Sequence, residues 1–187
     1  MNELPSEEAA LLAIARNAVA LWNDATLLFK HGRFARAASL AVLAGEEAGK
    51  FWLAKWKPDG CERQFNEHGS KLAVGAAFHA IESAGILIGS TGDLHDNYTA
   101  AIDDPHYAAW VSRAKALGQI KLAGLYVDLD DSGMSEPHVF VNEVTAASCL
   151  GFATGEVQRL YAAEIVRRNL PPLGDLPSMP NRRPGAG

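Results

Sequence analysis

The sequence lacks the features that mark several common classes of protein. Its two cysteines, Cys61 and Cys149, are far apart and form no Cys-x-x-Cys pair, so neither a zinc knuckle nor a disulfide framework is indicated. No apolar run reaches the length of a membrane span, because His79 and Glu82 interrupt the longest candidate, residues 73–89. The first residues also lack the basic start of a signal peptide. These absences fit a cytoplasmic protein that does not associate with membranes.

Signatures of several enzyme classes are also missing. No Glu-x-x-His occurs, which argues against a ferritin-like di-iron site. Residues 45–50 contain two glycines and a lysine without P-loop spacing, and no Gly-x-Ser-x-Gly nucleophile turn is present. Asp128, Asp130 and Asp131 are not followed by the rest of an EF-hand pattern. The sequence therefore predicts neither a metal site nor a bound cofactor.

The residues that are present predict a single all-α domain. The chain has 187 residues, of which 48% are hydrophobic, and this is enough for one core. The net charge of −5 argues against a general polyanion binder, although a local basic patch remains compatible with it. We expect a bundle of about five helices over residues 1–170. Residues 171–187 contain five prolines and predict a flexible tail.

Apolar residues at helical spacing predict where the helices lie. The expected ranges are 6–30, 33–56, 62–88, 105–122 and 141–169. The first two helices should be antiparallel neighbours because the connection between them is short. Residues 126–131 should be extended or irregular and 132–137 a turn. We expect Leu125 and Val127 to pack onto the bundle, with Tyr126 capping a groove.

The second predicted helix combines small residues with a charged end. Its ridge of mostly small residues should allow close approach to the first helix; the members are Phe34, Ala37, Ala38, Ala41, Gly45, Ala48 and Trp52. Glu47 shares a stripe with Leu40, Leu43, Phe51 and Ala54, which predicts a carboxylate among apolar side chains. Such a carboxylate needs a partner, and the nearest cation in sequence is Lys50. Glu46 also lies within reach of Lys50.

Three separated blocks give the sequence a family resemblance. They are residues 32–50 with their Glu-Glu-x-Gly-Lys ending, the pair His68 and Lys71, and the Gly-Leu-Tyr-Val-Asp run at 124–128. With these blocks in this order, the chain resembles the AbiV family of bacterial abortive-infection proteins over about residues 8–168. The resemblance implies a helical bundle that acts in phage defence, with arrest of host translation and activation by a phage component.

The resemblance also suggests a chemistry. AbiV proteins look similar to the HEPN ribonucleases, in which an Arg-x4-6-His motif acts on the scissile phosphate without metal, commonly across a dimer interface. Arg63 and His68 have this spacing. An imidazole can transfer the proton of a ribose 2′-hydroxyl, and a guanidinium can hold phosphate oxygens. On this interpretation RNA or the translation machinery is the target, a phage-encoded protein is the activator, and the chain forms a homodimer.

The alternative interpretation is a non-catalytic helical module that binds a protein partner. Arg-x4-His is a short motif, and the same residues fit a structural or partner-binding role. Both interpretations use one polar cluster on the second and third helices. Its candidate binding residues, together with two from the 124–128 block, are Glu46, Glu47, Lys50, Lys71, Tyr126 and Asp128.

The proline-rich tail should be dispensable for folding. A truncation after Leu170 should express and melt like the full chain, because residues 171–187 show no apolar period. Thermal unfolding of both proteins measures this. Insolubility or a large loss of stability in the truncated protein would show that the tail docks on the domain.

Overall fold

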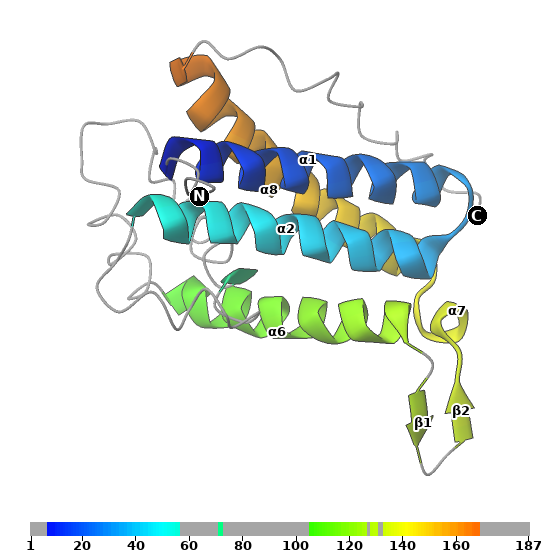
Figure 1. Cartoon of the computed structure of the whole chain (residues 1–187). Coiled ribbons are helices and arrows are strands. Elements are labelled where there is room, and N and C mark those ends of the chain that lie inside the picture. The colour runs from blue at the N-terminus through cyan, green and yellow to red at the C-terminus, as the bar shows by residue number, and fades with distance from the viewer. Residues whose placement is uncertain (1–6, 57–70, 73–104, 127, 131–132, 169–187) are drawn as a thin grey trace, which may run out of the picture.

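A computed structural model of the chain describes residues 7–56, 71–72, 105–126, 128–130 and 133–168. This part of the chain forms a helical bundle (Figure 1), which confirms the predicted all-α class. Its helices are α1 (Glu7–Lys30), α2 (Phe34–Trp56), α6 (Pro105–Leu125), α7 (Pro137–Phe140) and α8 (Glu143–Arg168). The predicted third helix, 62–88, lies outside the described residues except for Lys71 and Leu72, which are helical. The predicted tail also lies outside them.

The ends of the first two helices follow local chemistry. Glu7 and Glu8 lie in the first turn of α1 and Lys30 in its last turn, so charges of both signs favour the helix dipole. Gly32 follows with a φ of 71°, a left-handed conformation that glycine adopts at little cost. The backbone N–H of Arg33 then donates to the carbonyl of Leu28 at 2.9 Å and closes the helix end. This tight turn makes α1 and α2 antiparallel neighbours, as predicted.

The N-terminus of α8 is capped by a side chain. The Asn142 Oδ1 accepts hydrogen bonds from the Thr145 backbone N–H at 3.0 Å and from the Thr145 hydroxyl at 3.1 Å. The predicted start at about residue 141 is therefore two residues early, since Val141 is the C-cap of the short α7. The predicted end of α6 at 122 is three residues early.

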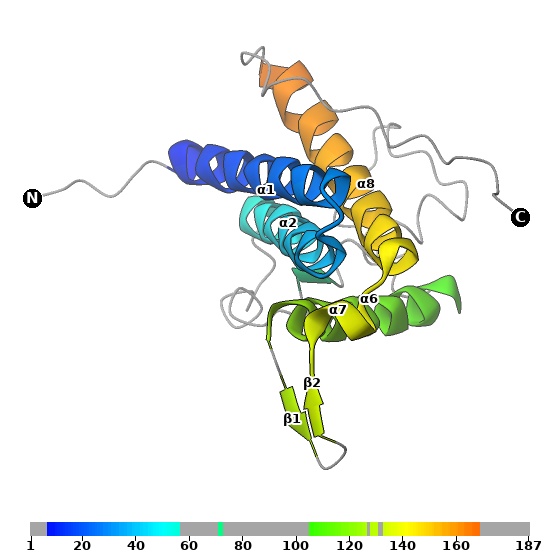
Figure 2. The same ribbon diagram turned by 90° about the vertical axis from the view of Figure 1, so that its right-hand side faces the viewer.

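The connection from α6 to α7 differs from the prediction. Strands β1 (Asp128–Asp130) and β2 (Gly133–Ser135) pair antiparallel, with Leu129 opposite Met134, and the hairpin projects from the bundle (Figure 2). Treating 132–137 as only a turn was therefore wrong. Packing of Leu125 on the bundle was also wrong: Leu125 is 42% exposed and Tyr126 is 63% exposed. The chain leaves the bundle here to enter the hairpin, so both side chains are open to solvent. Val127, which was also predicted to pack on the bundle, lies outside the described residues.

Helix α2 is the central element of the described bundle. It contacts α1, α8 and α6, and Figure 1 shows it between α1 and α6. Most of the small-residue ridge predicted on α2 is buried, with Ala37, Ala38 and Ala41 fully inaccessible to solvent. The ridge does not face α1 alone, because Gly45 lies against the ring of Phe152 on α8. Small side chains thus let α2 meet two helices at close range.

Two apolar clusters fill the space around α2. The larger one draws on α1, α2, α6 and α8 and includes the side chain of Leu72, which is 1% exposed. The smaller one joins the N-terminal half of α1, the C-terminal half of α2 and Leu160 of α8. Among the helices that the structure describes, none is long and apolar enough to cross a membrane.

A buried hydrogen bond joins α1 to α8. The Trp22 indole N–H donates to the Thr154 hydroxyl at 2.9 Å, and that hydroxyl donates to the Leu150 carbonyl at 2.7 Å. Thr154→Val should lower the free energy of unfolding by about 1–3 kcal/mol, because the buried indole N–H loses its acceptor. Urea denaturation measures the change.

Thr26→Val is the matched control. Thr26 is also buried, but its hydroxyl donates only to the Trp22 carbonyl of its own helix at 2.9 Å. The control should therefore change stability by less than Thr154→Val. Equal effects of the two substitutions would show that the link between α1 and α8 contributes nothing specific.

Candidate functional site

The charged side chains near the end of α2 lie on two different sides of the helix. The stripe predicted to bury Glu47 is in fact the most open side of this central helix. Leu40, Leu43 and Ala54 are only partly buried on it, and of the predicted stripe Phe51 alone is fully buried. Glu47 and Lys50 lie on the same side and form an ion pair at 3.5 Å, with side chains 20% and 34% exposed. The predicted pairing is present, but it is a partly solvated surface pair of small energetic value.

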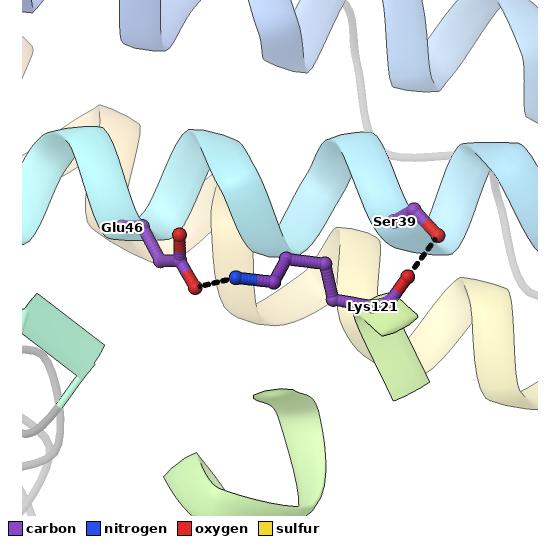
Figure 3. Close-up of polar contacts among 3 residues, drawn as sticks. All are labelled: Ser39, Glu46 and Lys121. Carbon is purple, nitrogen blue, oxygen red and sulfur yellow. Dashed lines mark hydrogen bonds and ion pairs between the residues drawn. The ribbon is translucent and has the colours of Figure 1, made fainter. Parts of the chain in front are cut away.

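The buried carboxylate belongs instead to Glu46, one position along. Its side chain is 4% exposed and accepts a hydrogen bond from the Lys121 ammonium at 2.5 Å (Figure 3). Lys121 lies on α6 and its side chain is 7% exposed. Helix α6 covers the side of α2 on which Glu46 lies, so this carboxylate loses water and gains a cation. The identification of Glu47 as the buried group was therefore wrong by one residue.

The same side of α2 carries a second polar link to α6. The Ser39 hydroxyl lies 2.9 Å from the carbonyl oxygen of Lys121 (Figure 3). It also lies 3.1 Å from the carbonyl oxygen of Ala35 in its own helix. Lys121 is thus held to α2 through both its side chain and its backbone. Gly124 makes this approach feasible, because a Cβ there would collide with the Ser39 hydroxyl and the Ala35 carbonyl. Sequence reasoning assigned Gly124 to a family block but did not identify this contact.

The segment at Lys71 also reaches α2. A Cβ on Gly49 would collide with the backbone carbonyl of Lys71, so the absence of a side chain at 49 lets the two backbones touch. The neighbouring Leu72 is buried in the larger core cluster and fixes the segment there. Gly49 follows Glu46 by three positions and precedes Lys50 by one. The backbone at Lys71 is thereby brought beside the charged end of α2.

Two other predicted site residues lie away from this cluster. Tyr126 is exposed beyond the end of α6, and Asp128 begins β1 of the projecting hairpin. The proposed catalytic residues, Arg63 and His68, lie outside the described residues. The structure thus brings together the α2 residues and the backbone of Lys71, and adds Ser39 and Lys121, which the sequence analysis did not include.

Two other potentially reactive side chains of the described bundle, those of Cys149 and Glu156, are buried. Burial raises the pKa of the Cys149 thiol to about 11, although nearby Arg113 acts in the opposite direction. This cysteine is therefore a neutral thiol at physiological pH and a poor nucleophile. Glu156 is fully buried and pairs with Arg159 on the next turn of α8. No group of three His, Cys, Asp or Glu side chains suited to a metal ion occurs within the described ranges.

Comparison with known proteins gives one family. A family model of the HEPN type, described as AbiV, matches residues 8–157. The matched range contains Ser39, Glu46, Glu47, Lys50 and Lys121, together with Arg63, His68 and Lys71. No curated protein and no solved structure matches the chain.

Glu46 and Glu47 form a natural pair for testing which carboxylate stabilises the bundle. Glu46→Ala should lower the free energy of unfolding by about 3–5 kcal/mol, because Lys121 is left buried without its anion. Glu47→Ala should cost less than about 1 kcal/mol, because its pair with Lys50 is solvated. Chemical denaturation of both variants measures the difference. Equal losses, or a larger loss from Glu47→Ala, would contradict the assignment.

Proposed function

The chain belongs to the AbiV family of abortive-infection proteins, and from this membership we propose that it defends against phage by interfering with host RNA or translation. In this proposal the functional surface is the polar cluster formed by the charged end of α2 and residues 63–71. A metal-independent ribonuclease activity of Arg63 and His68 is the form of interference that the sequence motif favours.

The contact between Gly49 and Lys71 carries the proposal. It anchors the end of the segment containing Arg63, His68 and Lys71 beside Glu46, Glu47 and Lys50. His68 stands three residues before Lys71, so covalent geometry keeps the two Cα atoms within about 11 Å in any conformation. In this proposal the His68 imidazole would act near the charged end of α2.

The residue types fit cleavage of RNA by attack of the ribose 2′-hydroxyl. The His68 imidazole would transfer the proton of that hydroxyl near neutral pH. The Arg63 guanidinium would bind the phosphate oxygens and favour the developing negative charge. Lys71 would add positive charge to the same segment. Glu47 and Lys50, which are partly exposed, would contact RNA or orient these groups.

A second candidate is a non-catalytic module that arrests translation by binding a protein. The buried Glu46–Lys121 pair supports it, because a polar pair inaccessible to solvent holds helices together without touching a substrate. In this case His68 and Lys71 would stabilise the bundle or contact the partner. The two candidates differ in what His68 does.

His68→Ala separates the two candidates. If His68 transfers a proton, the variant should keep its melting temperature and lose RNA cleavage by about 10²–10⁴-fold, since general acid–base catalysis contributes that much. Phage protection should fall with it. The measurements are cleavage of labelled total RNA by the purified protein, plating efficiency of phage on expressing cells, and thermal unfolding.

His31→Ala provides the control. His31 is an exposed histidine in the turn after α1, so its loss should change neither cleavage nor protection. If His68→Ala cleaves RNA like the wild type, the ribonuclease proposal is wrong. If the wild type cleaves no RNA and His68→Ala lowers protection only in proportion to its loss of stability, the non-catalytic module is supported.

A further inference from the structure

An exposed apolar surface lies at the end of the bundle where the hairpin leaves it. Its large side chains come from the end of α6, from α7 and from the first turn of α8; they are Leu122, Leu125, Tyr126, Val139, Phe140 and Val144. We call this set the α6–α7 surface. Val139 is 68% and Phe140 is 59% exposed, and α7 has no buried residue. Helices α6 and α7 are in contact, and exposed apolar side chains gathered at one place are typical of an interaction site.

The local sequence around this surface is acidic. Residues 122–158 contain no lysine or arginine and six acidic residues, one of which is the buried Glu156. Glu136 and Glu143 flank α7 and are exposed, while Asp128 and Asp130 belong to β1. Because the chain has a net charge of only −5, this segment concentrates its negative charge.

Cations from another part of the chain lie at the same end of the bundle. The turn from α1 to α2 carries Lys30, Arg33 and Arg36, and α2 contacts α7. Asp128, Asp130, Glu136 and Glu143 outnumber these three cations, and the hairpin projects away from α1 (Figures 1 and 2). The field at the hairpin side of the α6–α7 surface is therefore negative.

We propose that the α6–α7 surface binds a protein segment that presents apolar side chains flanked by lysine or arginine. Apolar contact with Tyr126, Val139 and Phe140 would supply affinity, since exposed aromatic residues are typical anchors of protein interfaces. The acidic flank would steer a basic partner and reject an acidic one. The inference goes beyond the proposed function, because it holds whether or not the chain cleaves RNA.

The charge argues against the other occupants of such a surface. Nucleic acid and anionic lipid would be repelled by the carboxylates, since both are bound through lysine and arginine. A second copy related by a two-fold axis would bring the same acidic flanks together. A basic protein segment is the occupant whose charge complements the surface.

Two peptide probes test the proposal on the full-length protein. One is an 18-residue helix with leucines on one face and lysines on the other, and the second has glutamate in place of every lysine. The lysine peptide should bind at least about tenfold more tightly by fluorescence anisotropy, and its affinity should fall as salt rises. Phe140→Ser should weaken binding about tenfold, and the double variant Glu136→Gln, Glu143→Gln should reduce the salt dependence.

Leu27→Ser is the matched control, because Leu27 is 56% exposed on α1 and α2 lies between α1 and α6. It should bind the lysine peptide like the wild type. Equal affinity of wild type and Phe140→Ser, or tighter binding of the glutamate peptide, would overturn the proposal. Tighter binding of a single-stranded RNA or of anionic phospholipid vesicles at this surface, abolished by Phe140→Ser, would overturn it as well. So would self-association in sedimentation velocity that the same substitution abolishes.

Discussion

The burial of α2 is the constraint on which the rest of the described structure depends. This helix contacts α1, α8 and α6, so a side chain on it must be apolar, small, paired, or on the one open stripe. Each polar residue of α2 obeys that rule. Ser39 and Glu46 are buried and bonded to Lys121, whereas Glu47 and Lys50 pair with each other at the surface. The packing of α2 against its neighbours therefore determines both the stability of the bundle and the position of the candidate site.

The α2–α6 contact illustrates this packing. Gly124 has no side chain that would keep the two helices apart. Ser39 can therefore bond to the backbone carbonyl of Lys121, and Glu46 to its ammonium. Replacing a buried ion pair with apolar groups is often neutral, so the pair is more informative about orientation than about gross stability. It fixes how far α6 lies along α2, and therefore where the hairpin and the α6–α7 surface emerge.

Local patterns predicted the helices well and the tertiary contacts poorly. The bounds of α1 and α2 followed from apolar spacing, first-turn acids and Gly32, all of which act within a few residues. The buried carboxylate was misassigned because apolar residues occur on every side of α2, and the Glu47 stripe therefore looked like a core face. Its true partner, Lys121, is 75 residues from Glu46, and no local pattern links them. The hairpin was missed because each strand has only three residues.

The sequence identified residues of the candidate site better than it predicted how they are arranged. The Glu-Glu-x-Gly-Lys ending of α2 was identified as important, and the structure gives its residues three separate tasks. Glu46 joins α6, Gly49 receives the backbone at Lys71, and Glu47 with Lys50 stays accessible. The apolar periodicity of α2 could not assign these roles, since it does not say which neighbouring helix covers each side of α2. The family membership then supplies the biological setting, which is phage defence.

A double-mutant cycle on Glu46 and Lys121 tests the central claim, that this pair joins α2 to α6 in the native bundle. The free energy of unfolding would be measured for wild type, Glu46→Gln, Lys121→Met and the double variant. We expect the double variant to be less destabilised than the sum of the two single changes, with a coupling of about 1–3 kcal/mol. Additive losses, with a coupling near zero, would contradict the account.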